Sequence, residues 1–140
     1  MFDMGAEPYL VAGVTVAIMA QRLVRLNCAK CRQPYKPTDE EIQQLNLGPD
    51  VLERARFAKG AGCPECRNTG FKGRIGLFEL VLGTPEFRRA VASQASIPDL
   101  QRAARDQGYR TMLEDGVQKV IHGWTTPDEV IKAVFTQTIE

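Results

Sequence analysis

The hydrophobic pattern divides the chain into an apolar beginning, a mixed middle and a helical end. Residues 9–20 carry apolar side chains on all sides, a pattern typical of an element that is buried on every side. The few residues before Tyr9 cannot bury such an element. We therefore expect the sequence to be the closing part of a longer protein or a shortened piece of one.

Two runs with strand character lie on either side of the middle of the chain. Residues 21–26 are short and mixed, whereas residues 73–82 carry apolar side chains on both faces. Apolar side chains on both faces are typical of an interior strand. The economical arrangement is an antiparallel pair of strands, with residues 28–72 as a long folded insertion in the hairpin.

The insertion contains signals for two short helices. Thr38 is followed three residues later by Glu41, and this spacing predicts a capping box at the start of a helix. The Gly48-Pro49 pair ends that helix, and Asp50 is a candidate cap for the next one. An insertion of this size has little core of its own without a metal ion.

The last third of the chain predicts four capped helices. Thr84, Ser96 and Thr126 are each followed by a proline and an acidic residue, which favours a helix start. Glu129 is placed to complete a capping box with Thr126. A further helix is predicted at residues 112–121 by its apolar spacing. Four short helices with brief links predict a compact bundle over residues 84–140.

Composition and charge are those of an ordinary soluble protein. The 140 residues are 44% hydrophobic and 25% charged, with a formal net charge of +1. This balance does not mark the chain as a nucleic-acid binder. The longest apolar run is shorter than the ~20 residues that cross a bilayer. We therefore expect a cytoplasmic protein that does not span a membrane.

All four cysteines occur in two C-x-x-C pairs, Cys28 with Cys31 and Cys63 with Cys66. Four thiolates fit the tetrahedral preference of Zn²⁺ in closed structural sites, so the spacing predicts a zinc module. Two disulfides or a redox dithiol are the alternatives. The absence of a secretory signal argues against disulfides, and a redox dithiol would leave the second pair idle.

Basic residues gather around the cysteines. They either offset the negative charge of four thiolates on one Zn²⁺ or form a docking face for an acidic partner. Nucleic acid is a third possibility, but aromatic side chains that could stack on bases are scarce. The basic residues are Arg22, Arg25, Lys30, Arg32, Lys36, Lys59, Arg67, Lys72 and Arg74.

No motif in the sequence carries catalytic chemistry by itself. The chain contains neither a G-x-x-x-x-G-K-[ST] phosphate loop nor a G-x-S-x-G elbow. His122, the one histidine, comes just before Gly123 at a predicted helix end, where a ring nitrogen can donate to a free carbonyl. Trp124 is expected to be a packing residue. We therefore assign no catalytic and no cofactor-binding residue.

At this point the motifs resemble a known family. Residues 3–12 and 20–25 are similar to the closing part of the motor-ATPase core of the type II secretion and type IV pilus assembly family. Cys28-x-x-Cys31 and residues 63–79, with Gly-Arg-Ile-Gly at 73–76, resemble the tetracysteine element of its secretion and pilus-extension branch. Residues 108–130 also resemble that family.

The resemblance implies a fold class and a domain organisation. The chain is then an α+β fragment of an α/β, RecA-like ATPase C-terminal domain, with two strands that bracket a Cys₄ zinc module, followed by a four-helix C-terminal bundle. Residues 1–27 would end the RecA-like core, 28–72 form the zinc-binding insertion, 73–83 return to the core, and 84–140 form the helical subdomain.

The resemblance also implies partners and an activity for the longer protein. Such a motor is a hexameric ring in the cytoplasm, peripheral to the inner membrane, and it uses ATP and Mg²⁺ to drive pseudopilus or pilus assembly. Its partners would be an inner-membrane platform protein, the other secretion or pilus machinery, the rest of its own chain and neighbouring subunits, without nucleic acid. Its nucleotide machinery would lie before residue 1, so this chain alone is expected to be inactive.

Two other classes of function fit parts of the sequence. The first is a stand-alone zinc-ribbon adaptor that binds nucleic acid or protein, whose nucleic-acid affinity would fall steeply with salt. The second is a complete ATPase, against which the missing phosphate loop argues.

Overall fold

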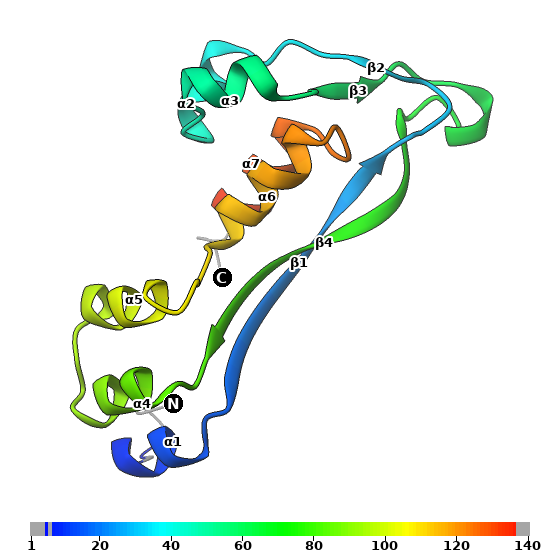
Figure 1. The fold of residues 1–140 in the computed structure, drawn as a ribbon. Helices are drawn as coiled ribbons and strands as arrows, with labels where there is room; N and C mark the ends of the chain where they lie inside the picture. Colours follow the sequence, from blue (N-terminus) through cyan, green and yellow to red (C-terminus); the bar gives the residue numbers. More distant parts are fainter. Residues whose placement is uncertain (1–4, 6, 137–140) are drawn as a thin grey trace. The chain divides into compact units, whose positions relative to one another are not determined.

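The computed structural model describes residue 5 and residues 7–136 (Figure 1). Asp3, Met4 and Ala6 of the family-like motif and the last four residues of the predicted helical subdomain lie outside the described residues. The elements follow in the order α1 (Pro8–Val14), β1 (Ala17–Asn27), β2 (Arg32–Pro34), α2 (Asp39–Gln44), α3 (Pro49–Arg54), β3 (Ala58–Gly60), the 3₁₀ turn η2 (Pro64–Cys66), β4 (Phe71–Leu82), α4 (Pro85–Ala92), α5 (Ile97–Arg105), α6 (Met112–Ile121) and α7 (Pro127–Phe135).

The chain divides into two compact units. Unit 1 contains the described part of residues 1–20 together with residues 79–111, and unit 2 contains residues 21–78 with the described part of residues 112–140. Among the described residues, no helix combines the length and the apolar character that a membrane crossing requires. The described residues form a mixed α and β structure with two small two-stranded sheets, β1 with β4 and β2 with β3.

The predicted strand pair is confirmed. In unit 2, the Cys28 amide donates to the Gly70 carbonyl over 2.9 Å, and in unit 1 the Gly83 amide donates to the Val16 carbonyl over 2.7 Å. Each bond joins the end of one strand to the beginning of the other, so β1 and β4 run antiparallel. The prediction of an interior strand is corrected, because β4 pairs with β1 alone within the described part of the chain.

Unit 1 is built on α1, α4 and α5. The predicted caps are confirmed, because the Phe87 amide donates to the Thr84 hydroxyl and the Asp99 amide donates to the Ser96 hydroxyl, each over 3.3 Å. Helix α4 packs against both α1 and α5, and it buries Phe87.

The apolar run at residues 9–20 is a helix followed by a strand instead of one element buried on every side. The Thr15 hydroxyl donates to the Val11 carbonyl over 2.6 Å at the end of α1, and β1 begins two residues later. Ala12 and Thr15 are buried, whereas Val14 and Val16 are three-quarters exposed within the described chain, at 76% and 75%.

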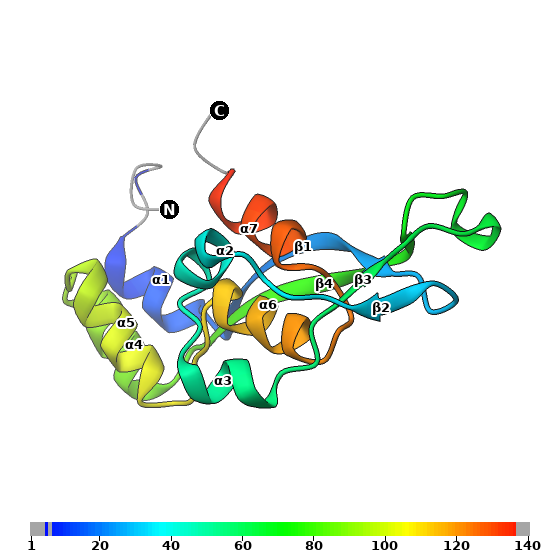
Figure 2. The same ribbon diagram turned by 90° about the horizontal axis from the view of Figure 1, so that it is seen from above.

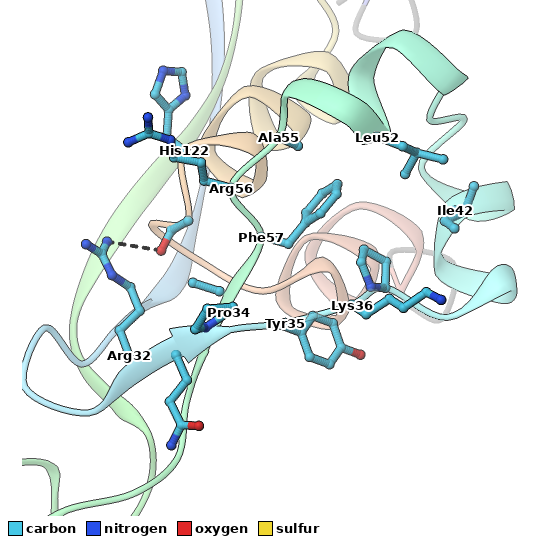
Figure 3. Close-up of a pocket in the computed structure, with 14 residues that line it drawn as sticks. Arg32, Pro34, Tyr35, Lys36, Ile42, Leu52, Ala55, Arg56, Phe57 and His122 are labelled. Carbon is cyan, nitrogen blue, oxygen red and sulfur yellow. Dashed lines mark hydrogen bonds between the residues drawn. The ribbon is translucent and has the colours of Figure 1, made fainter.

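Unit 2 has one hydrophobic core to which every part of it contributes. The insertion supplies Leu45, Leu47 and Phe57, and α6 and α7 pack against each other and contact this region through α2. The insertion and the last two helices therefore form one packed body, and a hollow of ≈ 710 Å³ lies beside β2 (Figure 3). The buried members of the core are Val24, Leu45, Leu47, Phe57, Leu77, Met112, Val120 and Val130.

Of the two helices within the insertion, α2 begins as the sequence predicts and α3 begins at a different cap. The capping box is confirmed: the Glu41 amide donates to the Thr38 hydroxyl over 3.2 Å, and the Thr38 amide donates to the Glu41 carboxylate over 3.0 Å. Gly48 caps α3 with Pro49 at its first position. Asp50 therefore lies in the first turn and is not the cap, because proline suits the first helical position.

The prediction of a single four-helix bundle is wrong. Helices α4 and α5 belong to unit 1, whereas α6 and α7 belong to unit 2. The physical reason is that each pair also packs on a helix outside the four: α4 packs on α1, and α7 packs on α2.

The N-terminus of α7 is fixed to β1 by a buried carboxylate. The Thr126 cap is confirmed, since its hydroxyl accepts from the Glu129 amide over 3.2 Å. The Glu129 carboxylate does not complete a capping box but accepts from the Arg25 amide at 2.9 Å and from the Arg25 guanidinium at 3.1 and 2.7 Å. The Thr125 hydroxyl adds a bond to the Arg25 carbonyl at 2.7 Å. As a result, α7 lies beside β1 (Figure 2).

We predict that replacing Glu129 by Gln lowers the free energy of unfolding at neutral pH by about 1.5–3 kcal/mol, because a charged acceptor in a buried place is lost. Burial opposes ionisation of Glu129, but the bonds from Arg25 prevail and hold the pKa of its carboxyl below the ordinary value. Its contribution is therefore complete above the unfolded-state pKa, about 4.3, and is lost as the pH falls through the lower folded-state pKa.

Urea unfolding of both proteins between neutral pH and about pH 3 measures this difference, which should shrink toward the acid end. Asp128→Asn is the matched control, because the neighbouring Asp128 pairs with Lys132 over 2.7 Å where both side chains are more than half exposed. It should change the stability by less than about 1 kcal/mol. Equal effects of the two substitutions would contradict the assignment.

Candidate metal centre

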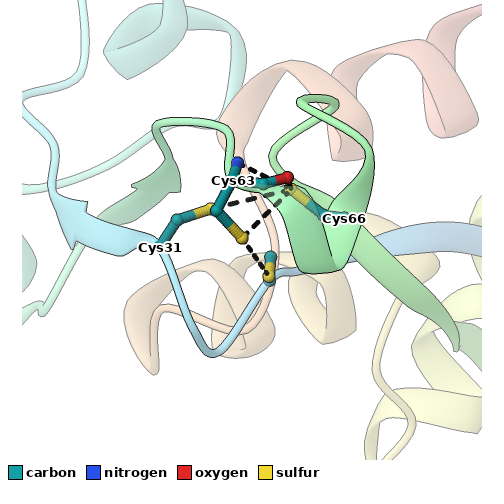
Figure 4. Close-up of side chains that lie close together, drawn as sticks. Cys31, Cys63 and Cys66 are labelled. Atoms are coloured by element: carbon teal, nitrogen blue, oxygen red, sulfur yellow. Dashed lines mark hydrogen bonds between the residues drawn. The ribbon is translucent and has the colours of Figure 1, made fainter.

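The four cysteines converge although the two pairs are far apart in the sequence. Cys28 directly follows β1, and Cys31 directly precedes β2. Cys63 directly precedes the 3₁₀ turn η2, and Cys66 is the last residue of that turn. Their four sulfur atoms all lie within 4.8 Å of one another. Figure 4 shows Cys31, Cys63 and Cys66 turned toward one another. The predicted ligand set is thus brought together in one place.

The spacing of the sulfur atoms is that of a tetrahedral thiolate site. Sγ–Sγ distances are 3.7 Å for Cys28 with Cys63, 3.8 Å for Cys31 with Cys66 and 3.7 Å for Cys63 with Cys66. Four sulfurs at about 2.3 Å from a central Zn²⁺ would be about 3.8 Å apart, the edge of that tetrahedron. A disulfide needs about 2.05 Å. All four cysteines are free, so they could hold a metal ion and are not two disulfides.

Backbone amides point at two of the sulfur atoms. The Gly62 amide donates to the Cys31 sulfur over 3.3 Å, and the Cys66 sulfur accepts from the Cys63 and Gly70 amides over 3.3 and 3.2 Å. Such bonds stabilise a thiolate and orient it toward a metal. Gly62 and Gly70 have φ values of 101° and 80°, which glycine adopts readily, so the backbone can turn tightly and aim these N–H groups at sulfur.

The local environment makes the thiols of Cys31 and Cys66 unequal. Burial would raise the pKa of the Cys66 thiol, but the amides of Cys63 and Gly70, with the neighbouring thiols, lower it to about 6. The pKa of the Cys31 thiol rises to about 11, chiefly through burial and against the Gly62 amide. Cys66 thus ionises before Cys31, and a bound cation would favour the thiolate form of its ligands.

Two close backbone approaches hold the cysteine pairs together. Strands β2 and β3 pair antiparallel with Arg32 opposite Gly60 and Pro34 opposite Ala58, which places Cys31 next to the chain that leads to Cys63. Gly60 also lies against Gly70: a Cβ added at Gly60 would be 2.0 Å from the Gly70 carbonyl oxygen. Glycine is therefore needed at this contact, and the contact brings Cys66 toward Cys31.

Asn27 is a structural residue that the sequence analysis missed. Its side-chain amide donates to the Ala58 carbonyl over 2.9 Å and to the Gly123 carbonyl over 3.0 Å, and its backbone amide donates to the Trp124 carbonyl over 2.8 Å. Asn27 thereby connects the end of β1, directly before Cys28, to β3 and to the turn after α6. A polar residue directly before the first ligand was the signal that could have indicated this role.

Several of the predicted basic residues have partners within the chain. Arg25 pairs with Glu129 and lies over the Phe71 ring, 4.1 Å from its centroid, and Lys59 lies over the Tyr35 ring. Lys72 pairs with Glu65 over 2.9 Å. The pKa of Lys72 is raised mainly by Glu65, with smaller effects of the Cys28 and Cys63 sulfurs. These three basic residues therefore interact with groups other than the sulfur atoms, so offsetting the charge of the thiolates explains only part of the basic surface.

His122 has the structural role that its place in the sequence indicates. Its Nδ1 lies 2.6 Å from the Gln118 carbonyl oxygen, and since a carbonyl can only accept, Nδ1 carries the proton in this contact. The imidazole also lies against Trp124, with ring centroids 5.0 Å apart. These contacts hold the end of α6.

Comparison with known proteins gives a consistent result. A family model described as "Type II/IV secretion system protein" matches residues 1–132. The chain is 36% identical over 129 residues to the type IV pilus assembly ATPase PilB of Thermus thermophilus, covering 92% of this chain and 14% of that protein. It is 36% identical over 135 residues to the type II secretion system protein E of Pseudomonas aeruginosa, covering 94% and 26%.

A third relative, the type II secretion system protein E of Pectobacterium carotovorum, is 38% identical over 131 residues, covering 93% of this chain and 25% of that protein. The chain thus spans about a quarter or less of the length of these relatives.

We predict that Gly60→Ala destabilises unit 2 by about 2 kcal/mol or more, because the added Cβ would force apart the backbones of Gly60 and Gly70. Urea unfolding followed by circular dichroism measures the change. Gly48→Ala is the control, since no atom lies within 4 Å of its added Cβ and its φ of −78° suits alanine. It should cost no more than about 1 kcal/mol. Similar losses for both variants would show that the close approach does not matter.

Proposed function

Because the chain belongs to the family of type II/IV secretion system proteins, we propose that it is the C-terminal part of a motor ATPase for protein secretion or pilus assembly. The names of its relatives support this assignment. In the longer motor, a hexameric ring would couple ATP hydrolysis to pseudopilus or pilus assembly. The phosphate loop is missing from this sequence, so the ATP and Mg²⁺ chemistry is assigned to the rest of the motor.

We assign one structural Zn²⁺ to Cys28, Cys31, Cys63 and Cys66. The observation that carries this assignment is the tetrahedral spacing of their sulfur atoms, 3.7–3.8 Å in three pairs. A closed set of four thiolates leaves no open position for a substrate, which is characteristic of a structural site and not of a catalytic one. The ion would fix the two knuckles against each other and so hold β2 and β3 in place.

The proposed role of the zinc-bearing module is to dock the motor on an inner-membrane platform protein, in the cytoplasm at the membrane surface. Strand β2 supports this role, because all three of its residues are exposed. We assign α1 with β1 and β4 to the end of a RecA-like core in the complete motor. The arrangement of one helix followed by an antiparallel strand pair is consistent with this assignment.

A stand-alone zinc-ribbon adaptor is the weaker candidate. The family match extends over residues 1–132 and so includes unit 1, which an adaptor built only on the cysteines would not need. Aromatic side chains that could stack on bases are also scarce among the basic residues near the cysteines.

We predict one zinc per chain by elemental analysis of protein purified without metal-affinity steps. Cys63→Ser should weaken zinc binding by roughly tenfold or more, because even changes around a ligand cost 10–100-fold. Glu65→Gln is the matched control in the same turn. It removes an exposed pair with Lys72, in which both side chains are more than half exposed, and should leave the zinc content unchanged. A normally folded chain without metal would refute the assignment.

Zinc removal should loosen all of unit 2, because the insertion shares its core with α6 and α7. At free zinc 100 times the dissociation constant, the metal stabilises the bound form by about 2.7 kcal/mol. After chelation, amide hydrogen exchange in residues 28–72 and in α6 and α7 should therefore accelerate by about 100-fold. Exchange in α4, which lies in unit 1, should change less. Acceleration confined to residues 28–72 would contradict the shared core.

A further inference from the structure

A groove in unit 2 lies directly after the first cysteine knuckle. It has a volume of ≈ 710 Å³ and is formed by β2, the residues after it, α2, α3 and the chain entering β3. Its apolar lining includes Ile42, Leu52, Ala55 and Phe57. In Figure 3, Phe57 lies in the middle of the groove, with Leu52 and Ile42 on the side of the short helices. The groove thus offers an apolar surface next to the proposed zinc.

The charged groups that line this groove are all basic. Arg32, Lys36, Arg56 and His122 are exposed members of the lining, which contains no Asp or Glu. Within the described residues, none of Arg32, Lys36 and Arg56 takes part in an ion pair. Their positive charge is therefore not neutralised inside unit 2.

Two acidic groups near the groove already have partners. The Glu41 carboxylate accepts from the Tyr35 hydroxyl at 2.9 Å and from the Thr38 amide at 3.0 Å, and Asp128 pairs with Lys132 at 2.7 Å. The Arg32 guanidinium donates to the Gly123 carbonyl over 3.3 Å, so it lies against the turn after α6. The groove therefore combines uncompensated positive charge with an apolar base.

We propose that this groove binds an acidic peptide segment of a protein partner, which places an apolar side chain against the half-buried Ile42 and Leu52 and carboxylates near Lys36 and Arg56. The inference rests on the proposed docking function and names its surface and the chemistry of its partner. Charge complementarity favours this occupant, since carboxylates gain from the unpaired cations while an apolar side chain is removed from water. A basic or purely apolar segment would leave the cations without partners.

The test uses a fluorescein-labelled twelve-residue peptide with a central Leu-Phe pair between two blocks of Asp and Glu, and the whole chain loaded with zinc. Fluorescence polarisation should show saturable binding that weakens as salt is raised. Lys36→Glu with Arg56→Glu should weaken binding at least tenfold. These residues are changed because neither is adjacent to a cysteine, whereas Arg32 directly follows Cys31.

Arg54→Glu with Arg74→Glu is the matched control, because both are exposed residues of unit 2 outside the groove lining and the double change alters net charge equally. It should retain binding within twofold. The proposal would be overturned by equal loss of binding in both double variants or by no binding of the acidic peptide. It would also be overturned if a lysine-flanked peptide bound as strongly, or if the chain preferred vesicles of anionic phospholipid. The zinc content of the same samples is measured as well. Failure of the unsubstituted chain to bind the acidic peptide while it retains its zinc contradicts the groove proposal alone, whereas a chain without zinc contradicts the zinc assignment.

Discussion

The convergence of four sulfur atoms is the constraint on which unit 2 depends. Cys28 and Cys63 are 35 residues apart in the sequence, yet their sulfur atoms lie 3.7 Å from each other. Thiolates this close repel one another unless a cation lies between them. Hydrogen bonds to sulfur from the Gly62, Cys63 and Gly70 amides lower part of this cost. A divalent ion would supply the rest, and closure of such a long loop is then maintained by ligation.

The cysteine cluster is coupled to the last helices through a short series of buried contacts. Asn27 precedes the first ligand and bonds to β3 and to the turn after α6. Two residues earlier, Arg25 holds the start of α7 through Glu129. The strand that leads to Cys28 is therefore bonded both to the insertion and to the C-terminal helices, whose apolar side chains share one core.

Local signals in the sequence were sufficient for four helix caps, the cysteine cluster and the family. Thr38, Thr84, Ser96 and Thr126 cap helices as predicted, because a cap involves only neighbouring residues. The cysteine spacing predicted the cluster, and the match over residues 1–132 confirms the resemblance to the secretion and pilus assembly family.

Arrangements that depend on distant residues could not be predicted in the same way. Glu129 has the spacing of a capping box, but a guanidinium 104 positions earlier provides a better partner. The choice between one helical bundle and two pairs also depends on contacts of α4 with α1 and of α7 with α2, which no short pattern encodes. The groove is likewise formed by side chains from four separate segments.

Pro34 in β2 limits how other chains can associate with this protein. The Tyr35 amide donates to the Phe57 carbonyl, and the Ala61 amide donates to the Cys31 carbonyl. Because inward and outward backbone groups alternate along an antiparallel strand, Arg32 and Pro34 direct their backbone groups to the free edge. Proline offers no N–H there, so β2 is a poor template for strand addition and for edge-to-edge aggregation. A molecule that binds beside β2 is therefore selected by its side chains and not by a backbone ladder.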